Sequence, residues 1–163
     1  DQVEAMTMSD RIAVMHAGRI AQLDTPYNAY EHPASNFAST FLGKTNKFVA
    51  QALPPVDESS GRVKVGAHTL ETAPYRLQGE VHAYIRPEKI HVQGAGGAGL
   101  AGRIQTKLFL GSVWMLEVET ELGMIRVNAP NREPVTLNEG DPVTLSWNSR
   151  DVQVLPTEEV AHA

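Results

Sequence analysis

The feature that most constrains the fold is the regular interruption of residues 46–155 by glycine and proline. Thirteen Gly and ten Pro occur in the 163 residues, and they divide this region into short segments bounded by turn residues. Short segments that recur roughly every 8–12 residues, with turn signals between them, are typical of a small barrel or sandwich. The spacing therefore predicts a mainly β fold, with short strands rather than long helices over most of the chain.

Two of the expected strands show the alternation of a half-buried sheet. Residues 80–86 have one apolar face and one face that is expected to be polar, which carries Tyr84 and Arg86. In residues 112–120, Trp114, Leu116 and Val118 are expected to point inward, and core packing is expected for Trp114 and Trp147. The strands predicted over the region are 47–53, 62–65, 80–86, 90–92, 100–110, 112–120, 124–129, 143–148 and 152–155.

Residues 1–43 follow a different pattern. Val3 and Met6 have helical spacing, and two apolar runs, 11–15 and 20–23, are joined through Gly18, which can adopt positive φ. Two short helices are then expected, one starting at Thr25-Pro26 and one starting at Ser35 and stopping at Gly43. We therefore expect three parts: an α/β segment at residues 1–43, a small barrel at residues 44–155, and a polar tail at residues 156–163.

Composition excludes several classes of function. The formal net charge of −5 and the pI of about 5.6 disfavour a nucleic-acid-binding surface, which needs a basic patch. The chain has no Cys, so it can form neither disulfides nor a thiolate metal site. No apolar run approaches the length that spans a bilayer, so any membrane role is expected to come through a partner rather than by direct insertion.

Residues 1–26 resemble the segment that closes the nucleotide-binding domain of ABC transporter ATPases. Asp1-Gln2 matches the end of the family's Thr-His-Asp-Gln run, and the helix end at residues 9–11 and the strand pair formed by Ile12–Met15 and residues 18–20 follow in the family's order. The resemblance implies that the switch histidine lies one residue before Asp1. Residues 1–43 would then be the C-terminal remnant of that domain.

Residues 46–155 resemble the small OB-like regulatory barrel of the same importers, which is called a TOBE domain. The matches, in the family's order, are Tyr84–Glu88, Gly102–Ile104 through Leu110-Gly111, Gly140–Val143 through Trp147, and Val152–Leu155. Residues 45–48 at the junction look most like importers of polyamines, with ferric-ion and phosphonate importers close. The resemblance therefore identifies the chain as the C-terminal part of an ABC importer ATP-binding subunit.

The chain lacks the phosphate-binding loop, the signature motif and the magnesium-holding acidic strand of that family. No catalytic, nucleotide-binding or metal residues are therefore expected, and the fragment is expected to need no cofactor and to be no enzyme. The full-length parent would be an ATP-hydrolysing translocase that uses ATP and magnesium. The glycine-rich run at residues 94–99 has no Lys or Ser/Thr for phosphate and is expected to be a flexible connector.

Two sets of residues are candidates for specific roles. Arg86, Pro87 and Glu88 form a turn in which Arg86 could donate to a carboxylate or to loop carbonyls, which suggests a structural or interface role; the alternative is a local salt bridge. Glu117 and Glu119, with Glu121, make an acidic stripe that could contact a cationic solute, although a solvated face paired with Arg126 is favoured. The six histidines show no metal-ligand spacing and are expected on the surface.

The resemblance implies a regulatory and dimerisation module that supports ATP-driven solute uptake, with a polyamine-like solute as the best guess. Its expected partners are a second copy, bound through the barrel, and membrane permease subunits, bound through the ATPase domain. The expected location is the cytoplasm, peripheral to the inner or plasma membrane. The alternative function is a small-ligand-sensing barrel that binds the transported solute and inhibits the transporter.

Overall fold

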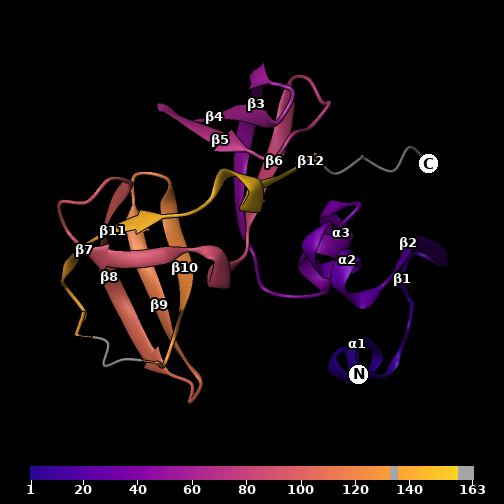
Figure 1. Cartoon of the computed structure of the whole chain (residues 1–163), viewed down its shortest axis with the longest axis horizontal. Coiled ribbons are helices and arrows are strands. Elements are labelled where there is room, and N and C mark those ends of the chain that lie inside the picture. The colour runs from indigo at the N-terminus through magenta and orange to yellow at the C-terminus, as the bar shows by residue number, and fades with distance from the viewer. Residues whose placement is uncertain (133–135, 158–163) are drawn as a thin grey trace.

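The structure, a computed structural model, describes residues 1–132 and 136–157. Figure 1 shows three groups of elements: a helix-and-hairpin group at the right, one sheet at the top and a second sheet at the left. The first group contains α1 (Gln2–Met8), β1 (Ile12–His16), β2 (Arg19–Asp24), α2 (Pro26–Glu31) and α3 (Asn36–Phe41).

The helix-and-hairpin group is shaped by local sequence signals. The side chains of Thr25 and Ser35 accept hydrogen bonds from backbone N–H groups in the first turns of α2 and α3, as N-cap residues do. Gly18 has φ of 76° in the turn that joins β1 and β2, a conformation that favours glycine. Val14 of β1 is buried with residues of α2 and α3, so the hairpin packs on the two helices.

The first sheet has the strand order β12-β6-β3-β4-β5, and all of its pairings are antiparallel. Because β12 comes from the end of the described chain, the sheet joins sequence segments from both sides of the second sheet. Its strands are β3 (Asn46–Asp57), β4 (Ser60–Val65), β5 (His68–Thr72), β6 (Glu80–Ile85) and β12 (Gln153–Pro156).

The second sheet has the order β10-β9-β8-β11-β7 and is also antiparallel. Its outer strands β10 and β7 contact each other, and the short helix η1 packs on β10, so the sheet curls into a partly closed barrel. Its elements, with the two short helices, are η1 (Pro87–Lys89), β7 (His91–Gly94), β8 (Leu100–Phe109), β9 (Val113–Thr120), β10 (Gly123–Pro130), β11 (Pro142–Ser146) and η2 (Ser149–Asp151). The prediction of a mainly β chain with a small barrel is confirmed.

One hydrophobic core serves both sheets. Ile85 of the first sheet is buried in the same cluster as Ile104, Leu116 and Val127 of the second. Apolar residues at alternate positions supply this core, because successive side chains of a strand point to opposite faces. A smaller cluster around Val14, with Ala29 and Ala38, lies between the hairpin and the helices.

Three expectations about the strands are wrong in detail. β3 continues through Pro54 and Pro55, because its pairing with β4 becomes irregular between Leu53 and Asp57 and so tolerates residues that cannot donate. The strand β5 was not expected. Trp114 does not join the core: it is the second residue of β9, where the centre of the Phe109 ring lies 4.7 Å from that of Trp114 and the Lys107 ammonium lies 4.6 Å from the Trp114 ring centre.

Of the helices in the described residues, none combines the length and the apolar character needed to cross a membrane.

Candidate functional site

The candidate site is the junction at which β6 meets α2 and α3, and Arg86 lies at its centre. The Arg86 side chain follows directly after β6 and is only 7% exposed. Its Nη1 donates to the carbonyl oxygens of Ser39, Gly43 and Lys44 at 2.9, 3.0 and 3.2 Å, and its Nη2 donates to the carbonyl of Tyr30 at 3.2 Å. One guanidinium from the barrel therefore holds the ends of two helices and the linker that follows them.

The acceptors of Arg86 suit its charge. Tyr30 and Ser39 lie in the last turns of α2 and α3, where backbone carbonyls lack helical partners and carry the negative end of the helix dipole. A planar guanidinium with five donors can serve several carbonyls at once. The position predicted to take a structural or interface role thus donates to loop and helix carbonyls rather than to a carboxylate.

Tyr30 covers the guanidinium and links it to Glu88. The centre of the guanidinium lies 4.2 Å from the centre of the Tyr30 ring, a cation–π geometry. The Tyr30 hydroxyl donates to Oε1 of Glu88 at 2.5 Å. Burial of the hydroxyl, helped by this hydrogen bond, raises the pKa of Tyr30 above its ordinary value of 10.0.

A second link between α2 and η1 lies beside the first. Nζ of Lys89 and Oε1 of Glu31 are 3.3 Å apart, and both side chains are half-buried. Pro87 is buried and begins η1, so the turn that follows Arg86 is fixed against the barrel. Glu31 of α2 therefore pairs with Lys89 of η1, and Glu88 of η1 pairs with Tyr30 of α2.

Asn36 connects α3 to the first sheet. Its Nδ2 donates to the carbonyl of Pro156 in β12 at 2.5 Å, and its Oδ1 accepts from the hydroxyl of Tyr84 in β6. Nδ1 of His82 lies 3.3 Å from the same oxygen. At Tyr84 and Arg86, the face of β6 that was expected to be polar is therefore covered: Tyr84 is 2% exposed because α3 packs on it.

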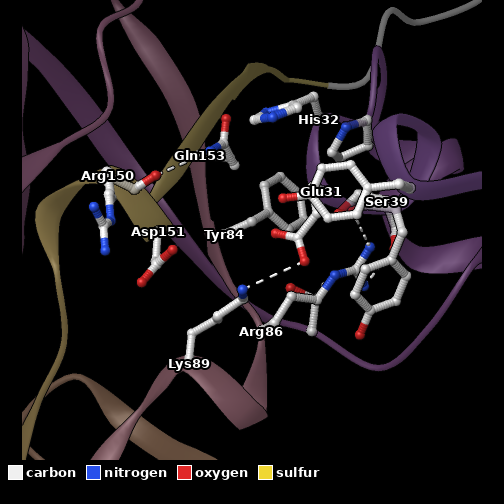
Figure 2. A pocket seen from close by; sticks show the side chains of 13 residues that line it. Glu31, His32, Ser39, Tyr84, Arg86, Lys89, Arg150, Asp151 and Gln153 are labelled. Carbon is white, nitrogen blue, oxygen red and sulfur yellow. Dashed lines mark hydrogen bonds and ion pairs between the residues drawn. The ribbon is translucent and has the colours of Figure 1, made fainter.

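A cavity of about 370 Å³ lies at this junction. Figure 2 shows Lys89 reaching Glu31 across it, with Arg150 and Asp151 of η2 on the side opposite Arg86. Positive and negative side chains both line it, and Glu31 and Lys89 are already paired. The contacts at this junction form a structural joint between the helices and the barrel.

A second cavity of about 500 Å³ lies between the two sheets. His68 of β5, Glu121 in the β9–β10 turn and Trp147 after β11 line it. Nε2 of His68 lies 2.6 Å from Oε2 of Glu121, so this pair connects the sheets at the cavity.

The three glutamates of the acidic stripe have different surroundings. Glu117 lies opposite Arg126 in the β9–β10 pairing and is half-buried. Glu119 is exposed and accepts a hydrogen bond from the side chain of Gln105. Of the three, Glu121 lines the cavity between the sheets, and Glu117 and Glu119 do not line it.

Asn46 is an important residue whose role the sequence alone does not indicate. Its side chain is 8% exposed and pairs with the outer edge of β10: Oδ1 accepts from the backbone N–H of Arg126 at 2.8 Å, and Nδ2 donates to the carbonyl of Arg126 at 2.9 Å. A side-chain amide with one acceptor and two donors can thus imitate a neighbouring strand. It belongs to the junction run at residues 45–48, but no sequence pattern indicates its partner.

Within the part of the chain that the structure describes, no group of three or more His, Cys, Asp or Glu side chains is placed to hold a metal ion.

Part of the barrel matches a known domain family, and the chain has sequence relatives among importer subunits. Residues 83–155 match the model of the TOBE domain. The Fe(3+) ions import ATP-binding protein FbpC of Agrobacterium fabrum is 35% identical over 156 residues, which are 95% of this chain and 44% of that protein. The spermidine/putrescine import ATP-binding protein PotA of Rubrobacter xylanophilus is 35% identical over 162 residues, covering 95% of this chain and 43% of that protein.

A solved structure supports the fold. The cytoplasmic molybdate-binding protein ModG, determined with molybdate bound, superimposes with a TM-score of 0.60 at 12% identity, over 69% of this chain and 96% of ModG. The chain spans less than half the length of the two relatives above. Residues 83–155 thus belong to the TOBE domain family, and the chain is a homologue of the C-terminal part of ABC importer ATP-binding subunits.

Proposed function

We propose that this chain is the regulatory and dimerisation part of an importer's ATP-binding subunit and supports ATP-driven solute uptake without catalytic residues of its own. The observation that carries the proposal is the Arg86 junction, where one buried guanidinium holds two helices to the barrel. A joint of this kind makes α2, α3 and the barrel move together. Movements of an attached ATPase domain would then reach the barrel through the Arg86 contacts.

The remaining parts of the proposal follow from the relatives. The full-length parent would bind ATP and magnesium in the preceding domain, whereas this part needs no cofactor. That domain would bind membrane permease subunits and so place the protein at the cytoplasmic side of the membrane. We propose a polyamine-like solute, because several related subunits are named spermidine/putrescine import ATP-binding proteins; ferric ion appears in the name of another.

An exposed apolar tip supports dimerisation. Leu108, Phe109 and Leu110, at the end of β8 and the start of the following turn, are 46%, 57% and 59% exposed. Three consecutive exposed apolar side chains on a soluble barrel are typical of an interaction surface. Asn131 holds this tip in place, because its Nδ2 donates to the carbonyl of Gly111 and its N–H donates to the carbonyl of Ser112.

Sedimentation of the full chain over a range of concentrations tests dimerisation. We expect a dimer at high concentration and a weaker one in Phe109→Ser, because the substitution removes apolar area from the tip. Val56→Ser is the matched control, since Val56 is 58% exposed but lies on β3, away from the tip. A chain that stays monomeric at high concentration contradicts dimerisation through the barrel.

The second candidate function is solute sensing, in which the barrel binds the transported solute and inhibits the transporter. The cavity of about 500 Å³ between the sheets favours it, because its size suits a small ligand. ModG, which shares the fold, is a molybdate-binding protein. Calorimetry of the chain with polyamines, ferric ion, phosphonates and molybdate tests this function, and a lack of heat with all four contradicts it.

A further inference from the structure

Glu121 is the only acidic side chain among the described residues that line the cavity between the sheets. The described residues that line it include Glu121 and His68 but no Lys and no Arg. A site for an oxyanion needs cationic or converging N–H donors, and the Glu121 carboxylate would repel an anion. A metal site needs several ligating side chains, and no such group exists among the described residues. The wall therefore favours a ligand that is positively charged and organic.

Glu121 is able to accept a cation. One of its oxygens, Oε2, lies 2.6 Å from His68, and a carboxylate retains further lone pairs that can accept from an ammonium group. The Glu121 side chain is 78% exposed, so it can turn toward a ligand without breaking a packed contact. The exposed contact with His68 is weak and does not hold it rigidly.

Trp147 supplies the second half of the site. Its indole packs against the core and also lines the cavity, next to Ser146 at the end of β11. Indole is the aromatic group that attracts cations best, and Leu70 and Leu100 provide apolar wall for the methylene groups of an amine.

The backbone beside the cavity is closely packed, which keeps it in shape. Gly99 lies at its edge with φ of 139°, and a Cβ atom there would come within 2.2 Å of the carbonyl oxygen of Leu145. Only glycine allows the β7–β8 connector to approach β11 in this way. The glycine-rich run that the sequence suggested as a connector thus also forms part of the cavity wall.

We infer that this cavity binds a small organic cation, with Glu121 pairing with its ammonium group and Trp147 contacting it through the indole face. The inference rests on the solute-sensing proposal and names its ligand class. It also separates the three glutamates of the acidic stripe: Glu121 contacts the ligand, whereas Glu117 and Glu119 do not line the cavity.

Tryptophan fluorescence tests the inference in the full chain. Trp114 and Trp147 are the two tryptophans, so the Trp114→Phe variant reports on Trp147 alone. We expect putrescine and butylamine to change its fluorescence in a saturable way. In the same background, Glu121→Gln should weaken binding at least about tenfold, because the carboxylate is the charged partner of the ammonium. Glu119→Gln, the matched control two residues earlier on β9, should leave the affinity unchanged.

Calorimetry with the unsubstituted chain and with Trp147→Phe provides a second measurement, and we expect several-fold weaker amine binding in the variant. Saturable binding of sulfate or molybdate without binding of amines overturns the inference while leaving solute sensing intact. Amine binding that Glu121→Gln does not weaken also overturns it. A chain that binds none of these ligands contradicts both proposals, and circular dichroism of each variant confirms that the fold is retained.

Discussion

Arg86 shows how one side chain determines the relation between two parts of the chain. A buried cation is unfavourable unless its donors are satisfied, and Arg86 meets this condition with four carbonyl oxygens and one aromatic face. Gly43 makes the arrangement possible, since a Cβ there would lie 3.0 Å from Cε2 of Tyr30. The identity of residue 86 is therefore tied to the path of the chain at residues 30–44.

Arg86→Lys tests this dependence. Lysine keeps the charge but presents a compact ammonium with three donors, which cannot serve all four carbonyls that Arg86 contacts. We expect the free energy of unfolding to fall by about 2 kcal/mol, since a hydrogen bond to a charged group contributes about 1.5–3 kcal/mol. Urea denaturation followed by circular dichroism measures the change. Arg76→Lys, at an exposed position, should change it by less than about 0.5 kcal/mol; equal effects at both positions would contradict the role of Arg86.

Tyr30 gives the junction a pH dependence at high pH. Because its pKa is raised in the folded state, Tyr30 keeps its proton at pH values where the unfolded chain, with a tyrosine pKa of about 10, loses it. The stabilisation is complete below about pH 10 and is lost as the pH rises above it, at about 1.4 kcal/mol per pH unit. Between about pH 9 and about pH 11, the free energy of unfolding of Tyr30→Phe should decline less steeply with pH than that of the unsubstituted chain. Tyr27 is 69% exposed, so Tyr27→Phe should show the same steep decline as the unsubstituted chain.

At the scale of elements, β3 connects the two sheets through its first residue. The strand belongs to the first sheet, yet the Asn46 side chain pairs with the backbone of β10 in the second. β10 is an outer strand whose free edge would otherwise expose an unpaired N–H and carbonyl at Arg126. Asn46 therefore closes an edge of the barrel and fixes the angle between the sheets.

Asn46→Ala tests whether the Asn46 side chain protects the edge of β10 at Arg126. The substitution leaves the N–H and carbonyl of Arg126 without the Asn46 side chain, so we expect a loss of about 2 kcal/mol in the free energy of unfolding. Hydrogen exchange at the Arg126 amide should become faster than at its neighbours in β10. Asn148→Ala is the control, because Asn148 is exposed. An unchanged Arg126 amide in Asn46→Ala would show that the pairing does not hold the edge.

The sequence predicted the strands better than their surroundings. Alternation at Val81, Ala83 and Ile85 correctly indicated one buried face of β6, because period 2 is a local signal. It failed for Tyr84 and Arg86, since helices 40 or more residues away cover the other face and local pattern carries no information on them. The prediction that Trp114 packs in the core was wrong for a related reason, since β9 extends beyond the core. The partners of Asn46 and Glu121 likewise depend on tertiary pairing.

The whole molecule combines two hydrophobic clusters of different size, one in the barrel and one between the hairpin and the helices. The barrel core draws on both five-stranded sheets, whereas the hairpin of β1 and β2 has Val14 as its buried residue and exposes Met15, Ile20 and Leu23 at 52%, 58% and 48%. A two-stranded hairpin is marginally stable by itself and depends on what packs against it. The Arg11–Leu23 segment packs on α2 and α3, and these helices are held to the barrel by Arg86 and Asn36.

Hydrogen exchange in a dilute, monomeric sample compares the two clusters. Amides of β1 and β2 should exchange at least about 100-fold faster than those of β8 and β9, because local opening of a small cluster exposes less apolar surface than opening of the barrel. In the Arg86→Lys variant, amides of α2, α3 and the hairpin should exchange faster, whereas those of β8 and β9 should be nearly unchanged. The substitution weakens the contacts that hold the helices to the barrel and does not alter the barrel core. Uniform strong protection of hairpin and barrel would mean that residues 1–43 and the barrel unfold as one unit, so that the hairpin is an integral part of the barrel's fold and not a remnant of a larger sheet.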